Sequence, residues 1–230
     1  MKSFTSKFSL ASVVALLAFA NSTLAGPPLI CHSLDIGAAK SLPWVSNGWK
    51  PTGAETYNVN NLVAETISIL DSNPTVIVHM ETLRRAVIYS QKDPQVAKRL
   101  FLAFVSRSEK GSGSPTAALT KFDAGYLAET FKQYEWIDKH GYDPAHNFDG
   151  YALIKQALKQ RPNDAQMNFA AALVALDGPI EDQKSYAQKA VAGATSDPLL
   201  ARNLGTHFMS AKTETMSNMI TRNSDKVALQ

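Results

Sequence analysis

The residues Ala157 to Ala165, ALKQRPNDA, carry the clearest structural signal in the chain. A small and an apolar residue, Ala157–Leu158, are followed after five residues by Asp164–Ala165. The same spacing joins Ala190–Val191 to Asp197–Pro198, at an offset of 33 residues (190 − 157). A short sequence pattern that recurs at a fixed offset is typical of repeated structural units.

A third copy of this spacing lies upstream. Ala86–Val87 is followed after five residues by Asp93–Pro94, and it begins 71 residues before Ala157 (157 − 86). Aspartate is a favoured residue at a helix N-cap, and proline suits the first turn of a helix. Each copy therefore predicts the end of one helix and the start of the next.

Apolar residues at spacings of three and four predict helices along most of the chain. The expected helices span residues 57–70, 76–90, 95–108, 116–140, 148–160, 163–176, 179–194 and 198 to about 219. We find no convincing strand pair, because prolines interrupt the flanks of the Asn47–Gly48 turn. The predicted fold class is all-α, with a single helical domain over residues 57–220 and a flexible tail at 221–230.

Three features of these helices give further expectations. In the helix at 76–90, Glu81, Arg84 and Arg85 are expected to lie largely on the face opposite the apolar stripe. The helix at 95–108 is apolar all round, which is typical of a central, buried helix. Gly125 interrupts the longest helix at a cost of about 1 kcal/mol relative to alanine, so a kink is expected there.

The N-terminus predicts a secretory signal peptide over residues 1–25. Lys2 and Lys7 precede the apolar run Phe8–Ala20, and the small-residue site Thr23–Ala25 precedes Gly26. The run is too short for a stable membrane span. We therefore expect an exported protein, periplasmic or secreted, with no membrane span after signal removal.

Removal of this peptide changes the charge balance. The mature chain would have 205 residues (230 − 25), enough for one domain or one short solenoid. It would carry 21 basic residues (23 − 2) against 20 acidic ones, a net charge of +1. A nearly neutral chain gives no argument for a nucleic-acid partner.

Residues 26–56 are rich in proline and tryptophan and predict an extended N-terminal strap, with one helical turn near 35–40. Trp44 and Trp49 are expected to pack against the helices; the alternative is an aromatic partner-binding surface. Cys31 is the single cysteine, so no intrachain disulfide is possible. It is either a free thiol or pairs with a cysteine of a partner, including a second copy in a homodimer.

The stretch Ala157–Ala165 resembles the junction between tetratricopeptide repeats. Arg202–Gly205 is similar to the Leu-Gly pair of a repeat's first helix, and Ala171–Ala172 holds the equivalent place one period earlier. The offsets of 33 and 71 residues are close to one and two periods of the roughly 34-residue repeat. At Asn168 the sequence departs from the pattern, which has an aromatic residue there.

The resemblance is close within residues 151–205 and weak over Ile77–Arg107. It implies a right-handed array of antiparallel helix pairs, a tetratricopeptide-like α-solenoid. Such arrays present a concave surface suited to an extended partner. The alternative architecture is an irregular helical bundle.

We find none of the usual catalytic or nucleotide-binding spacings, and no cofactor is expected. The densest polar cluster is a His-x-x-Asp-x-x-His-x-x-Asp series formed by His140, Asp143, His146 and Asp149. Imidazole and carboxylate groups together suit zinc or another divalent ion. Each residue also has a structural interpretation: His140 at a helix end, Asp143 in a turn and Asp149 as a helix cap.

The sequence thus predicts an exported helical-repeat scaffold or adaptor that binds a protein or peptide partner without catalysis. The alternative is a metal-dependent enzyme or metal-binding protein that uses the loop from His140 to Asp149.

Overall fold

The computed structural model describes residues 26–45, 53–73, 75–110, 114, 116–175 and 180–207. The predicted signal peptide, Trp49 and the C-terminal tail lie outside these residues. Within the described ranges the chain forms helices and no strand, which confirms the all-α class. None of the helices in these ranges has the length and apolar character needed to cross a membrane.

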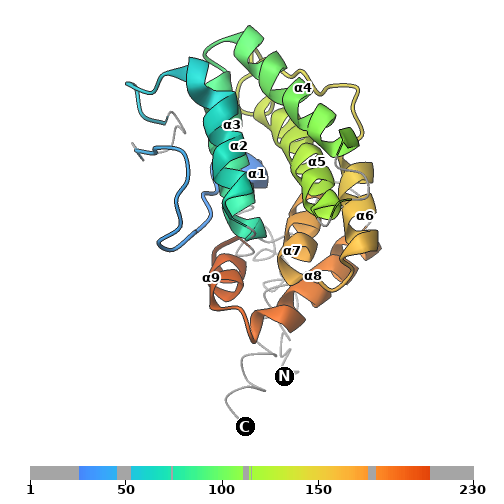
Figure 1. The fold of residues 1–230 in the computed structure, drawn as a ribbon. Helices are drawn as coiled ribbons and strands as arrows, with labels where there is room; N and C mark the ends of the chain where they lie inside the picture. The colour runs from blue at the N-terminus through green and yellow to red at the C-terminus, as the bar shows by residue number, and fades with distance from the viewer. Residues whose placement is uncertain are drawn as a thin grey trace, which may run out of the picture.

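The helices follow one another in the order shown in Figure 1. They are α1 (Pro28–Cys31), the 3₁₀ helix η3 (Val59–Asn61), α2 (Leu62–Asp71), α3 (Val76–Ser90), α4 (Pro94–Lys110), α5 (Ala117–Tyr134), α6 (Gly150–Gln160), α7 (Ala165–Val174), α8 (Ile180–Ala194) and α9 (Pro198–His207). Helix pairs in close contact are mostly first or second neighbours in the chain, such as α3 with α5 and α7 with α8. The longer-range exceptions include α3 with α7 and the contacts of α1.

The three recurring aspartates lie where one helix ends and the next begins. The Asp164 side chain accepts a hydrogen bond from the Met167 N–H at 2.9 Å and caps α7. Asp197 Oδ1 accepts from the Leu200 N–H at 3.0 Å, in the first turn of α9. These bonds satisfy N–H groups that have no partner within the helix. The predicted helix breaks are confirmed, while a regular tetratricopeptide-like array stays a prediction.

Helix α3 is the buried centre of the fold. Of its 15 residues, only Arg85 is not buried. The expectation that the helix at 95–108 would be central is wrong, because α4 buries one face and leaves Leu102 52 % exposed on the other. Apolar composition alone did not distinguish the two helices; the difference comes from what covers each of them.

The polar face of α3 is covered by residues 26–45, the N-terminal segment. Glu81 and Arg84 were expected to face solvent, but their side chains are 0 % and 2 % exposed. Glu81 Oε2 accepts hydrogen bonds from Arg84 Nε at 2.8 Å and from the Leu34 N–H at 3.0 Å. Glu81 Oε1 accepts from Arg85 Nε at 2.7 Å. A buried charge is stable only when it is paired and hydrogen-bonded in this way.

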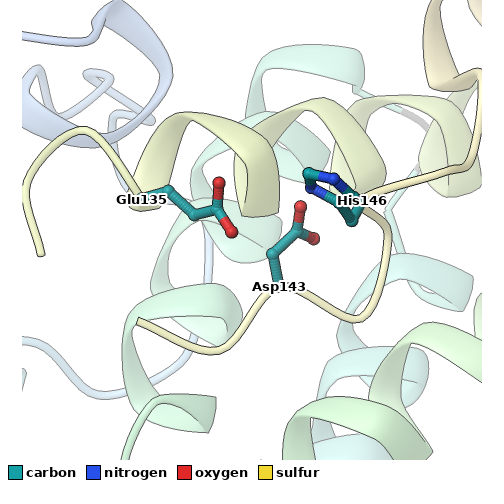
Figure 2. Close-up of side chains that lie close together, drawn as sticks. All are labelled: Glu135, Asp143 and His146. Atoms are coloured by element: carbon teal, nitrogen blue, oxygen red, sulfur yellow. The ribbon is translucent and has the colours of Figure 1, made fainter. Parts of the chain in front are cut away.

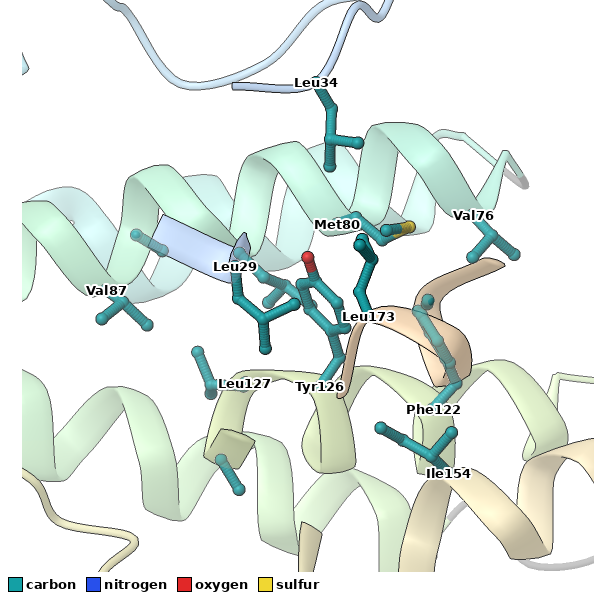
Figure 3. Close-up of a cluster of buried hydrophobic side chains, with 14 of the residues drawn as sticks. Leu29, Leu34, Val76, Met80, Val87, Phe122, Tyr126, Leu127, Ile154 and Leu173 are labelled. Atoms are coloured by element: carbon teal, nitrogen blue, oxygen red, sulfur yellow. The ribbon is translucent and has the colours of Figure 1, made fainter. Parts of the chain in front are cut away.

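The N-terminal segment enters the core through α1, which contacts α3, α5 and α7. Figure 3 shows Leu29 beside Tyr126 and Leu127 of α5, with α3 on its other side. The Leu29 N–H donates to Gln133 Oε1 at 2.8 Å. We expected an extended chain at this point. Instead Pro28 occupies the first turn of a short helix, a position that suits its fixed φ angle.

Helices α5 and α6 meet at a pair of glycines. A β-carbon built on Gly125 would lie 2.5 Å from the Gly150 carbonyl oxygen and 2.9 Å from Ile154 Cγ1. A β-carbon on Gly150 would lie equally close, 2.5 Å, to the Gly125 carbonyl oxygen. Helix α5 runs through Gly125 without a break, so the expected interruption is absent. The glycine instead allows two helix backbones to approach closely.

We predict that Gly125→Ala lowers the free energy of unfolding by about 1–3 kcal/mol, because the added methyl group overlaps backbone atoms that cannot move independently. Chemical denaturation measures this change. The matched control is Gly205→Ala in α9, where a β-carbon meets nothing within 4 Å. There the better helix propensity of alanine should leave stability equal or up to about 1 kcal/mol higher. Equal effects at the two sites would contradict the proposed backbone contact.

We also predict that Glu81→Gln destabilises the protein by about 3 kcal/mol at pH 7, because it removes the charge that compensates buried Arg84. Burial alone would raise the pKa of Glu81, but the hydrogen bonds and charges of Arg84 and Arg85 outweigh it and lower the pKa. The stabilisation is therefore present above the ordinary glutamate pKa of about 4.3 and is lost as the pH falls through it towards the lower folded-state value.

The measurement is urea denaturation of both proteins at several pH values. The stability difference between wild type and Glu81→Gln should shrink between pH 5 and 3. Exposed Glu181, which pairs with Lys184 on the surface at 3.2 Å, supplies the control substitution Glu181→Gln, with an expected change below about 0.5 kcal/mol. A pH-independent difference would rule out the charge as its origin.

Candidate functional site

The loop at residues 135–149 joins α5 to α6 and is the longest connection that the structure describes without a gap. Connections of about this length without secondary structure of their own are uncommon in a compact domain, and they are usually either functional or flexible linkers. The loop is anchored close to α6, where Ala145 is fully buried and the Phe148 ring packs edge-on against Phe101 at 5.2 Å. Its path is therefore set by packing.

Two further contacts fix the middle of the loop. Gln91, the C-cap of α3, accepts from the Tyr142 N–H at 2.8 Å and donates to the Tyr142 carbonyl oxygen at 3.2 Å. At Gly141, a β-carbon would lie 2.7 Å from Tyr134 Cδ1 and 2.9 Å from the Asp138 carbonyl oxygen. Glycine is therefore required for the loop to pass this close to the end of α5.

Within this loop, Glu135, Asp143 and His146 form a cluster of possible metal ligands. One ligand atom from each residue lies within 4.8 Å of the other two. Figure 2 shows the carboxylates of Glu135 and Asp143 facing one another, with the His146 ring beside Asp143. Asp143 Oδ1 accepts a hydrogen bond from the Ala145 N–H at 2.7 Å. Asp143 Oδ2 is buried and has no hydrogen-bond partner among the described residues.

The electrostatics of the cluster favour a cation. Burial raises the pKa of Asp143 and the nearby charge of Glu135 adds to the rise, while the Ala145 N–H, His146 and Lys132 oppose it. The Lys132 ammonium group is engaged with Glu129 Oε1 at 2.9 Å. Glu135 is also the C-cap of α5, at the negative end of the helix dipole. Two carboxylates thus share a site of negative potential.

The observed cluster differs from the predicted series. Asp143 and His146 belong to it, whereas exposed His140 and Asp149 do not. The His140 N–H donates to Asp138 Oδ1 at 2.9 Å, and Asp149 Oδ1 accepts from the Ala152 N–H at 2.8 Å as the N-cap of α6. Asp149 therefore has the structural role that the sequence also allowed.

The sequence did not indicate Glu135 as a possible ligand, because the end of the preceding helix was predicted too late. The helix was expected to continue to residue 140, but α5 ends at Tyr134. The early end turns Glu135 from a helical residue into a loop residue that faces Asp143. No spacing in the sequence marks this change.

The same early end exposes apolar side chains. Trp136 is 60 %, Ile137 39 % and Tyr142 37 % exposed. Among the described residues, the other exposed large hydrophobic side chains are Val45 and Leu102. We refer to Trp136, Ile137 and Tyr142 as the loop patch. Exposed aromatic residues are enriched at protein interfaces.

The residues predicted for a partner or a disulfide lie elsewhere. Trp44 is half-buried: the Arg84 guanidinium lies 4.7 Å from its ring centre, and the Tyr89 ring packs edge-on at 6.2 Å. Cys31 is an exposed free cysteine. Partial burial raises its thiol pKa, against the charge of Arg84. A disulfide to a second copy stays a prediction, and Trp49 is outside the described residues.

Two other polar sites have structural explanations. Buried His79 bonds Asp123 Oδ1 at 2.7 Å through Nδ1, which ties α3 to α5. A surface pocket near the starts of α3, α7 and α9 is lined by Thr75, Val76, Arg161, Asp164, Ala165, Gln166 and Asp197. Its polar groups already bond one another: Gln166 Nε2 donates to Asp197 Oδ2 at 2.6 Å, and Arg161 pairs with Asp164 at 2.7 Å.

Comparison with known proteins returned no matching family model, curated protein or solved structure.

Proposed function

We propose that this chain is an exported helical scaffold that binds a protein or peptide partner through the loop patch, without catalysis. The observation that carries the proposal is the exposure of Trp136, Ile137 and Tyr142 within seven residues of one loop (142 − 135). Large apolar side chains gathered on a surface mark interaction sites, whereas scattered ones do not. Export rests on the N-terminal sequence pattern.

The composition of the loop patch suits a protein interface. Tryptophan and tyrosine are enriched among the residues that contribute most to binding free energy. Exposed Asp138, Lys139 and His140 lie between the patch residues in the chain and supply a polar rim. The bonds of Gln91 to Tyr142 hold the loop before binding, which reduces the entropy lost when a partner docks.

The packing of the N-terminal segment favours binding at the exposed loop patch over binding at the helix surfaces that this segment covers. Its side chains Leu29, Ile30 and Leu34 are buried, and α1 packs among α3, α5 and α7. A partner that displaced them would have to offset about 1.5–3 kcal/mol for each exposed side chain. Binding at the loop patch requires no such displacement.

We predict that a photo-reactive amino acid at position 136 crosslinks to a partner in the exported fraction, because Trp136 is the most exposed side chain of the loop patch. The matched control is position 102, since Leu102 is similarly exposed and apolar but lies on α4. Crosslinked products are detected by electrophoresis and identified by mass spectrometry. A product at 136 that is absent at 102 supports the proposal.

Equal products at the two positions, or none at 136, would contradict the proposal. With the identified partner in hand, Trp136→Ser should weaken binding by more than about tenfold, in the range of interface residues that dominate affinity. Circular dichroism of Trp136→Ser should match wild type, because this side chain is exposed.

A further inference from the structure

We propose that Glu135, Asp143 and His146 form a binding site for one divalent transition-metal ion of the zinc type. This inference goes beyond partner binding and does not depend on it. It rests on the convergence of the three ligand atoms and on the unpaired buried oxygen of Asp143.

The distances suit closure around an ion. Two ligand atoms that each lie about 2.1 Å from a tetrahedral ion are separated by about 3.4 Å. The three atoms here lie within 4.8 Å of one another, so a shift of the order of 1 Å brings them to that geometry. His146 is exposed and free to make this shift. The backbone of Asp143 stays in place because the adjoining turn is anchored at buried Ala145.

A bound ion would also give a partner to Asp143 Oδ2, the one buried oxygen of this cluster that lacks a hydrogen bond to a described residue. An unpaired buried oxygen is costly, and most such atoms in folded proteins have a partner. Asp143 Oδ1 already accepts the Ala145 N–H, so Oδ2 is the atom left to coordinate. The Ala145 N–H therefore acts from the second coordination shell and orients the carboxylate, as hydrogen bonds to metal ligands usually do.

The donor set selects the class of ion. One imidazole nitrogen with two carboxylate oxygens suits Zn²⁺ and related ions, whereas Ca²⁺ and Mg²⁺ prefer six or more oxygen ligands. Three protein ligands leave at least one coordination position open. Such an arrangement is typical of exchangeable and catalytic sites, while closed structural sites use four protein ligands.

Zn²⁺ titration of tag-free mature protein by calorimetry at pH 7 tests the proposal. We expect one ion per chain and no displacement by a tenfold excess of Ca²⁺. His146→Ala and Asp143→Ala should each weaken binding by more than about tenfold, since each removes a ligand. The matched control is His140→Ala: His140 is exposed in the same loop, lies outside the cluster, and should leave the affinity unchanged.

A second measurement needs no variant. In the NMR spectrum of the wild-type protein, Zn²⁺ should shift the ring resonances of His146 and leave those of His140 in place. The proposal is overturned if wild type does not bind Zn²⁺, if His140→Ala weakens binding as much as His146→Ala does, or if the His146 resonances do not move. Because the protein is tested alone, these outcomes are independent of partner binding.

Discussion

The fold depends on the buried carboxylate of Glu81. It holds Arg84 and Arg85 of the same helix and the backbone of Leu34 from the N-terminal segment. Without that segment, three charged side chains of the most buried helix would face water. With it, Ile30 and Leu42 also supply carbonyl oxygens to the two arginines, at 2.9 and 2.6 Å. Residues 26–45 are therefore part of the core and fix which helix lies at its centre.

Local signals in the sequence placed the starts of the longer helices to within a few residues, but not the start of α1. Asp164 caps α7, which begins at Ala165, two residues after the expected start (165 − 163), because a cap depends on a side chain and an N–H three residues away. The buried state of Glu81 could not be predicted in the same way, since it depends on a segment 47 residues earlier in the chain. The role of Gly125 was likewise hidden, because a helix break and a close helix–helix contact both favour glycine.

In the candidate site, too, some features have a local sequence signal and others depend on contacts between distant residues. The histidine–aspartate spacing pointed to this loop, and two of its four residues, Asp143 and His146, belong to the observed cluster. Glu135 and Trp136 were not recognised, because their placement in the loop depends on where α5 ends. The bonds that fix the loop after this end join Tyr142 to Gln91, 51 positions earlier in the chain, so they leave no local sequence signal.

The bonds of the N-terminal segment also constrain the order of assembly. The Leu29 N–H is paired with a residue 104 positions later, and the Asp35 N–H with Asn203 of α9, 168 positions later. The N-terminal segment is made early, but it therefore completes these contacts only after the last described helix has been made. Contacts between such distant residues slow folding. If the chain is exported, this delay keeps it unfolded, and so competent for translocation, until most of it has crossed the membrane.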